Sequence, residues 1–268
     1  MRAALLILLF LPGAAFAEAP SYRLSQADTM SYRYVSDGTI VTKAAQGTMN
    51  GAIRVDAIAV LAGDAADSAT VSLKRLVVIQ RGPEGVERPN TDAVLGLPYR
   101  LHFPGSGHVT VVRAPELPKE MESVADVARQ LESMFISLPA SSLEPGVAWA
   151  DTLRQVKEDG KDKSESTTFR EFKVLRDTLV AETPSVVISV QEKRKVRGRR
   201  HLEEQEGTAD VDLQGKEAGI AVFAPALGRL LARRSQGRLE GSIGFESRGN
   251  RLAVSQSIDY TNTVDLLP

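Results

Sequence analysis

The most concentrated chemistry in the sequence is the basic run EKRKVRGRRHLEEQ at residues 192–205. A run of this kind either binds an anionic surface or forms the solvated end of a β-hairpin, in which basic residues face acids across the ladder. Gly198 predicts the turn of that hairpin, with His201–Glu206 on the second strand. The candidate contacts to an anionic surface are Lys193, Arg194, Lys195, Arg197, Arg199 and Arg200.

Other residue patterns argue against catalysis and metal binding. The chain has no cysteine, which excludes disulfides and cysteine-based zinc or redox chemistry. His102 and His108 flank the turn FPGSG, but no third ligand follows at a supporting spacing, so we predict no metal site. The sequence also lacks a G-x-S-x-G elbow, a phosphate-binding loop and a dinucleotide fingerprint. We therefore predict no catalytic residue and no cofactor, and expect a protein that is not an enzyme.

Residues 1–17 match a secretory signal peptide. Arg2 precedes an apolar run from Ala3 to Leu11, and Ala15-Phe16-Ala17 fits the small-x-small cleavage pattern. The apolar run is far shorter than the ~20 residues that span a bilayer, so we expect cleavage after Ala17 and export as a soluble periplasmic or extracellular protein. Export removes nucleic acid as a partner, and a net charge of −1 gives no overall attraction to polyanions.

Most of the remaining chain alternates apolar and polar residues with period two, which predicts antiparallel strands with one buried face. In the clearest strand, near the C-terminus, one face carries Leu252, Val254, Ile258, Tyr260, Val264 and Leu266. Turn residues divide the chain into hairpins, including one with strands 29–36 and 39–46 around Asp37-Gly38. Such dense hairpins predict a mainly β (α+β) fold, an antiparallel meander curved into a half-barrel or barrel-like sheet.

One segment, residues 119–137, instead places its apolar residues at helical spacing, which predicts an amphipathic helix packed on or across the sheet. Its apolar stripe either packs as core, the usual role at this spacing, or lies as a lid over an apolar cavity. Trp149, the only tryptophan, either anchors the preceding linker against the core or stacks on a ligand. The candidate ligand-binding residues on apolar faces are Met121, Leu131, Met134, Phe135, Trp149 and Tyr260.

Two parts of the chain resemble each other and indicate an internal repeat. Residues 68–82 and 185–199 share an S-x-x-[VI]-S start, a basic middle and a glycine near the end. We therefore expect a first β-rich half over 18–138, a linker at 139–148 and a second β-rich half over 149–268.

Three motifs resemble a family of exported bacterial β-rich proteins of unknown function. They are GLPYRLHFPGSGHVTVV (96–112), ESVADVARQLESMFISLP (122–139) and LEPGVAW (143–149). The resemblance covers roughly residues 30–265 and implies no catalytic residue. More distantly, a signal peptide followed by an antiparallel sheet curved around helices is similar to the periplasmic lipoprotein carriers of the LolA/LolB type and the sensor RseB. That similarity implies a concave apolar face that takes acyl chains.

Together these features predict a non-enzymatic binding protein that holds a lipid or another apolar molecule in the concave face of a curved sheet. The alternative is a structural or protein-interaction role in the cell envelope, with another envelope protein as partner. That role would use exposed sheet edges or the mixed-charge run at 192–205. The two functions differ in whether the sheet presents an apolar concave surface.

Overall fold

The computed structural model describes residues 19–26, 28–65, 67–117, 126–202, 207–247 and 250–268. The two helices within these ranges are the short 3-10 helix η1 (Asp92–Val94) and α2 (Val127–Met134). The strands are β1 (Thr29–Ala44), β2 (Gly47–Ala65), β3 (Ser68–Gly82), β4 (Gly85–Glu87), β5 (Tyr99–His102), β6 (Thr110–Arg113), β7 (Ala148–Asp159), β8 (Asp162–Val180), β9 (Thr183–Leu202), β10 (Gly207–Ala224), β11 (Arg229–Ser247) and β12 (Asn250–Leu266).

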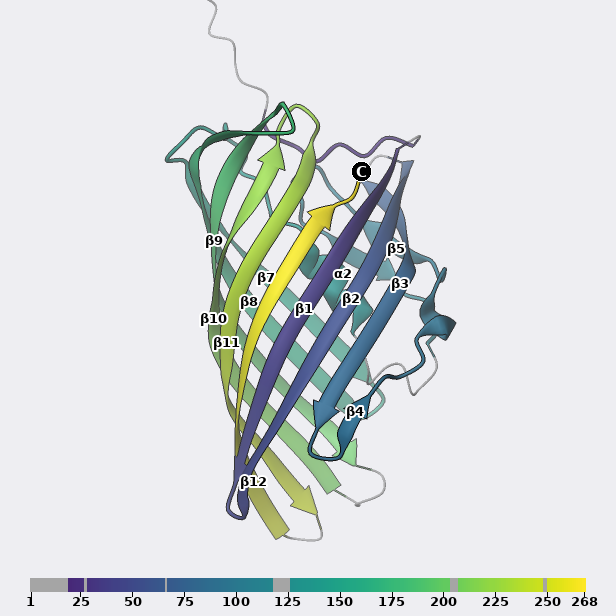
Figure 1. Cartoon of the computed structure of the whole chain (residues 1–268), viewed down its shortest axis with the longest axis vertical. Helices are drawn as coiled ribbons and strands as arrows, with labels where there is room; N and C mark the ends of the chain where they lie inside the picture. The colour runs from purple at the N-terminus through teal and green to yellow at the C-terminus, as the bar shows by residue number, and fades with distance from the viewer. Residues whose placement is uncertain (1–18, 27, 66, 118–125, 203–206, 248–249) are drawn as a thin grey trace, which may run out of the picture.

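All twelve strands belong to one antiparallel sheet, which curves strongly without closing (Figure 1). The strand order is β6-β5-β3-β2-β1-β12-β11-β10-β9-β8-β7, and β4 pairs with β3. The predicted mainly β, curved antiparallel architecture is therefore confirmed. The regions predicted as two halves lie in this one continuous sheet, joined through the pairing of β1 with β12. The predicted signal peptide and Met121 lie outside the described residues.

The two faces of the sheet differ in chemistry because successive side chains of a strand point to opposite sides. The inner, concave face carries the core, as Tyr32 on β1 shows, whereas the neighbouring Arg33 pairs with Asp56 on the outer face. Further ion pairs follow along the outer face of the long strands, among them Arg54–Asp37, Arg199–Asp210 and Arg234–Asp265. The outer face is thus suited to water. No helix among the described residues is long and apolar enough to cross a membrane.

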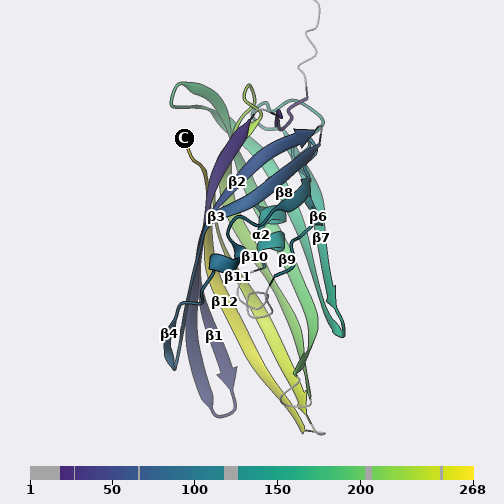
Figure 2. The ribbon, with the colours of Figure 1, turned by 90° about the vertical axis from the view of Figure 1, so that its right-hand side faces the viewer.

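Helix α2 and the segment 135–138 that follows it lie against the upper half of the inner face, between the two walls of the curved sheet (Figure 2). Side chains from the walls and from the N-terminal segment donate hydrogen bonds to backbone carbonyls of α2 and of the segment 135–138. The donors and acceptors are Arg233 to Ser133 (2.7 Å), Arg170 to Phe135 (3.3 Å), Tyr22 to Ile136 (3.1 Å) and Trp149 to Ser137 (3.1 Å). These bonds replace helical ones, so α2 ends at Met134 and not at residue 137 as predicted.

The upper core is built around the ring of Phe135. It makes edge-to-face contacts with Tyr22, Tyr32 and Phe103, with ring centroids 5.7, 5.4 and 4.8 Å away. Tyr22 in turn lies against Gly107, whose φ of +77° suits glycine, and a Cβ there would lie 2.4 Å from the tyrosine ring. We define this packed region, with α2 and the segment 135–138, as the filled end of the inner face.

Helix α2 also connects the two edges of the sheet through Glu132. One carboxylate oxygen accepts a hydrogen bond from the backbone of Val111 on β6, at 2.9 Å. The other accepts from the side chain of Gln155 on β7, at 2.8 Å. The helix therefore spans the gap that the unclosed sheet leaves at this level.

Two predicted turns are wrong. Gly38 lies in the middle of β1, between Ile53 and Tyr260 of the adjacent strands, and the strand continues to Ala44. Gly198 likewise lies within β9, which continues to Leu202. In both places the sheet supplies backbone partners on both sides, which outweighs the low intrinsic strand preference of glycine.

Candidate functional site

The predicted ligand-binding residues fall into two groups. Leu131, Met134 and Phe135 are buried in the core cluster of the filled end. Trp149 packs against that cluster, stacked on Phe172 at 5.2 Å between ring centroids. Tyr260 lies elsewhere, on the inner face of β12, where it contacts charged residues. The described residues of the helix stripe and Trp149 therefore occupy packing positions. Tyr260 belongs to a different part of the inner face.

The basic run is divided between the two faces of β9. Arg194 and Arg200 belong to the inner face, and the other four side chains belong to the outer face. Three of these four pair with acids on neighbouring strands: Lys193–Glu171, Arg197–Asp212 and Arg199–Asp210, at 3.7, 3.5 and 2.7 Å. The six predicted side chains thus form no single patch, and most of their outward charge is already paired.

Five inner-face residues form what we call the polar cluster: Glu192, Arg194, Glu217, Arg233 and Tyr260. Arg233 is central, because its Nη2 lies 2.7 Å from Glu192 Oε1 and 3.1 Å from Glu217 Oε1. Arg194 Nη2 lies farther from the same carboxylates, at 3.4 and 3.8 Å. The Tyr260 hydroxyl donates to Glu217 Oε2 at 3.0 Å. Two cations therefore compensate two buried anions.

Strand register brings these residues together. Four residues lie in one row across neighbouring strands, each directly opposite the next. They are Glu192 on β9, Glu217 on β10, Gly237 on β11 and Tyr260 on β12. Tyr260 reaches Glu217 across β11 because Gly237 has no side chain. A Cβ at that position would lie 2.6 Å from the tyrosine hydroxyl. Gly237 is therefore required for the contact between β12 and β10.

The protonation states of the cluster follow from burial and from these pairs. Burial by itself would raise the pKa of the Glu217 carboxyl, but Arg233 and Arg194 outweigh it and hold that pKa below its usual value of 4.5. Burial, with the Glu217 carboxylate beside it, raises the pKa of the Tyr260 phenol. At neutral pH the cluster thus contains an ionised Glu217 and a neutral Tyr260 that donates to it.

Below the polar cluster, towards the turns of the β1–β2 and β11–β12 hairpins, the inner face becomes apolar again. We call this region the open apolar face. It consists of Leu213, Leu239, Ile243, Phe245, Leu252, Val254 and Ile258. None of these residues belongs to the core cluster that α2 completes. Leu252 is 43% exposed and Ile243, Phe245 and Ile258 are half-buried, whereas Leu213, Leu239 and Val254 are buried between them. The inner face therefore offers an apolar surface outside the core, bordered by charged groups.

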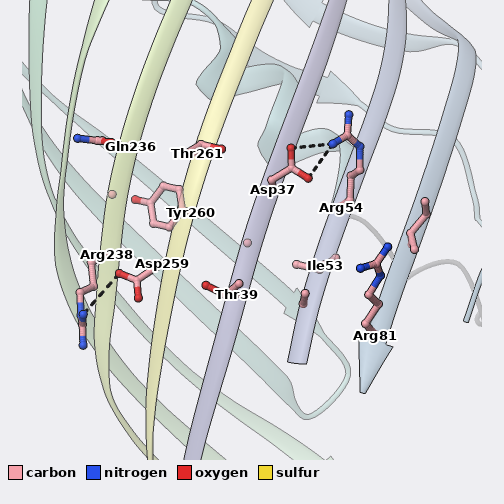
Figure 3. Close-up of a pocket in the computed structure, with 14 residues that line it drawn as sticks. Asp37, Thr39, Ile53, Arg54, Arg81, Gln236, Arg238, Asp259, Tyr260 and Thr261 are labelled. Atoms are coloured by element: carbon pink, nitrogen blue, oxygen red, sulfur yellow. Dashed lines mark hydrogen bonds and ion pairs between the residues drawn. The ribbon is translucent and has the colours of Figure 1, made fainter. Parts of the chain in front are cut away.

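A hollow of about 810 Å³ lies on the outer face across β11, β12, β1, β2 and β3 (Figure 3). Most of the residues that line it belong to the outer face: Gln236, Arg238, Asp259, Thr261, Asp37, Thr39, Ala52, Arg54, Ile79 and Arg81. Its charges are mostly paired, Arg54 with Asp37 at 3.0 Å and Arg238 with Asp259 at 3.6 Å. With a polar rim and few large apolar side chains, this hollow is a weaker candidate for an apolar ligand than the inner face.

No motif or spacing in the sequence identified Glu192, Glu217 and Arg233 as site residues. A signal was present, because Glu217 and Arg233 fall at inward positions of strands whose other inward residues are small or apolar. A charged residue on a buried strand face requires a partner. The partner itself could not be identified, because these residues are far apart in the chain and only the strand register places them side by side.

Comparison with known proteins gives no family assignment. No protein-family model and no curated protein sequence matches the chain. Among solved structures, a likeness to lipovitellin, studied for its lipid–protein interactions, has 12% identity and a TM-score of 0.47. It covers 89% of this chain but only 25% of the lipovitellin chain, so the chain spans about a quarter of that protein's length.

Two other likenesses are weaker. Neisserial surface protein A shares 9% identity, with 88% of this chain and 97% of that chain covered and a TM-score of 0.26. A DUF1329 family protein from Desulfovibrio piger shares 10% identity, with 85% and 83% covered and a TM-score of 0.16. None of these three TM-scores reaches 0.5. The resemblance of its motifs to an exported bacterial family stays a prediction.

Proposed function

We propose that the protein is a non-enzymatic binding protein that holds an apolar molecule, of the kind a lipid acyl chain represents, on the open apolar face. The observation that supports this most is the presence of partly exposed apolar side chains on the concave side of the sheet and outside the core cluster. Ile243, Phe245 and Ile258 are all half-buried there. A concave surface lined by apolar groups and bordered by a few polar ones is typical of small-molecule sites.

The size of this surface also fits a long apolar molecule. From Ile258 to Leu252 the strand β12 advances six residues, about 20 Å at the usual rise per residue. On β11, Leu239, Ile243 and Phe245 lie opposite this stretch and run the same length. The open apolar face is therefore a strip, which suits an extended chain better than a compact ring system.

An exported location belongs to the same proposal. It is supported by residues 1–17 alone, through the signal-peptide pattern. The mass of the protein purified from its own cells tests it, because cleavage after Ala17 would remove the first 17 residues. A protein that keeps these residues and is found in the cytoplasm would contradict this part of the proposal.

Binding of an uncharged probe tests the function itself. N-phenyl-1-naphthylamine becomes fluorescent in apolar surroundings, and we expect saturable binding that 1-hexadecanol displaces. Ile258→Glu should abolish this binding, because it places a carboxylate on the open apolar face. The matched control is Ser257→Glu, which adds the same charge one residue earlier, on the outer face, and should bind as the wild type does. Wild-type protein that binds neither the probe nor hexadecanol would refute the proposal.

The protein-interaction alternative has one observation in its favour, the outer hollow at β11, β12, β1, β2 and β3. Arg81 is exposed at its rim, and no ion pair is found for it among the described residues. Co-purification from the native cell envelope with wild-type protein and with Arg81→Glu would test this alternative. A partner retained equally by both proteins would rule out Arg81 as a contact.

A further inference from the structure

Arg194 differs from the other charged members of the polar cluster in its exposure. Its side chain is 25% exposed on the inner face, whereas the side chains of Glu192 and Glu217 are 3% and 2% exposed. Arg233 is also covered, because it lies beneath α2 and donates to the carbonyl of Ser133. A molecule on the concave side therefore meets the cationic part of a cluster whose anionic part is covered.

The contacts of Arg194 with other described residues use only part of its hydrogen-bonding capacity. Its Nη2 lies 3.4 and 3.8 Å from the two carboxylates, and its Nε donates to Thr168 Oγ1 at 3.3 Å. Arg233 has much closer partners, at 2.7 and 3.1 Å. A guanidinium has five N–H donors, and its strongest partners are carboxylate or phosphate oxygens at about 2.7–2.9 Å. Among the described residues, the contacts of Arg194 therefore leave donors for an acceptor supplied from the concave side.

The open apolar face begins in the same row of the sheet as Arg194. Arg194 on β9 is opposite Gly215 on β10, which is opposite Leu239 on β11, which is opposite Ile258 on β12. A charged donor and the start of an apolar strip therefore lie side by side on one face. An amphipathic molecule matches this arrangement, with its head group at Arg194 and its chain running from Ile258 towards the half-buried Ile243 and Phe245.

We propose that the ligand is an acyl chain with an anionic oxygen head group, a carboxylate or a phosphate, which Arg194 binds while the chain lies on the open apolar face. This inference rests on the proposed function and makes it more specific. A cationic head group would face the exposed guanidinium and be repelled. A neutral hydroxyl would accept one bond where a carboxylate or phosphate accepts two charge-assisted ones.

The test compares ligands that share a chain and differ in the head group. Hexadecanoate, 1-palmitoyl lysophosphatidate and 1-hexadecanol would each displace N-phenyl-1-naphthylamine from the wild-type protein at pH 8 and at constant ionic strength. We expect at least one of the two anions to bind about tenfold or more tightly than hexadecanol. Which anion binds more tightly tells whether the head group is that of a fatty acid or of a phospholipid.

Arg194→Gln should remove this preference, so that the anions bind the variant no more tightly than hexadecanol does. The matched control is Lys195→Gln, which removes the adjacent positive charge on the outer face and should keep the preference. Wild-type protein that binds hexadecanol as tightly as both anions would overturn the inference and leave the proposed function standing. Wild-type protein that binds no probe and no hexadecanol would instead refute the proposed function. The wild-type comparison decides between these outcomes even if the Arg194 variant does not fold.

Discussion

The filled end and the open apolar face are two stretches of the same strands, built by the same alternation of side chains, yet only the filled end belongs to the core cluster. At the filled end, α2 and the segment 135–138 supply the second layer that a sheet needs in order to bury its apolar face. At the open apolar face the apolar residues remain outside that core. The sheet alone therefore does not determine which stretch of its inner face joins the core. The inserted helix α2 and the segment 135–138 determine it.

The polar cluster lies at the boundary between these regions, and its position explains why the boundary is sharp. Arg233 binds the two carboxylates on one side and the last turn of α2 on the other. Separating buried charged groups from their partners costs several kcal/mol of free energy. The cluster thus anchors the end of the inserted helix and keeps a polar border on the open apolar face.

The largest expected difference between the two regions is in the free energy of unfolding lost when a phenylalanine is replaced by alanine. Phe135→Ala should destabilise the protein by about 3–5 kcal/mol, because the ring is fully buried among three other aromatic rings. Phe245→Ala makes the same change on the half-buried open apolar face and should cost about 1 kcal/mol. Urea unfolding of both variants measures the difference. Equal losses would mean that the open apolar face is packed as tightly as the core, which would also contradict the proposed function.

A second comparison is between the stability that a buried carboxylate contributes and the stability that an exposed one contributes. Glu217→Gln should cost about 3 kcal/mol, because it leaves Arg233 and Arg194 with one carboxylate where they had two. Asp210→Asn removes the partner of Arg199 on the outer face and should leave the melting temperature nearly unchanged. Thermal and urea unfolding at neutral pH check both. A Glu217 variant as stable as the Asp210 variant would show that the polar cluster does not hold the boundary.

The same pair of variants predicts a pH dependence. Because the folded protein lowers the pKa of Glu217, the stability that this group contributes is fully present above about 4.5 and is lost as pH falls through the lowered folded value. The stability gap between wild type and Glu217→Gln should therefore shrink as pH falls below 4.5. Urea unfolding at a series of pH values from 7 to 3 measures the gap. A gap that stays constant over this range would contradict the assignment of an ionised, paired Glu217.

The sequence predicted what depends on local pattern. Period-two alternation identified the fold class and the inward face of β12, from Leu252 to Leu266, because alternation is a property of neighbouring residues. The apolar spacing around Leu131 identified a helix, although its end was placed three residues too late. That end is set by donors from distant strands and the N-terminal segment, such as Arg170 and Tyr22, which no helical pattern reveals.

The candidate site could not be predicted, because it depends on pairings between distant strands. Glu192, Glu217, Arg233 and Tyr260 come from four strands, and a shift of register by one residue would move each to the other face. The same dependence on distant strands applies to Gly198. In isolation the glycine suggests a turn, and only its partners on β8 and β10 make it part of a long strand.

The smallest expected effect tests whether hydrogen bonds to the segment 135–138, beyond its packing, hold the filled end together. Tyr22→Phe removes the donor to the buried carbonyl of Ile136 and should cost about 1–3 kcal/mol, the usual penalty for a buried group left unsatisfied. Tyr99→Phe is the matched control, because the Tyr99 hydroxyl is buried and has no hydrogen-bond partner among the described residues. Its removal should be neutral or stabilise the protein by up to about 1 kcal/mol. If urea unfolding gave both variants the same stability, packing alone would hold the segment. The contrast with the open apolar face would then reduce to the presence of the aromatic rings around Phe135.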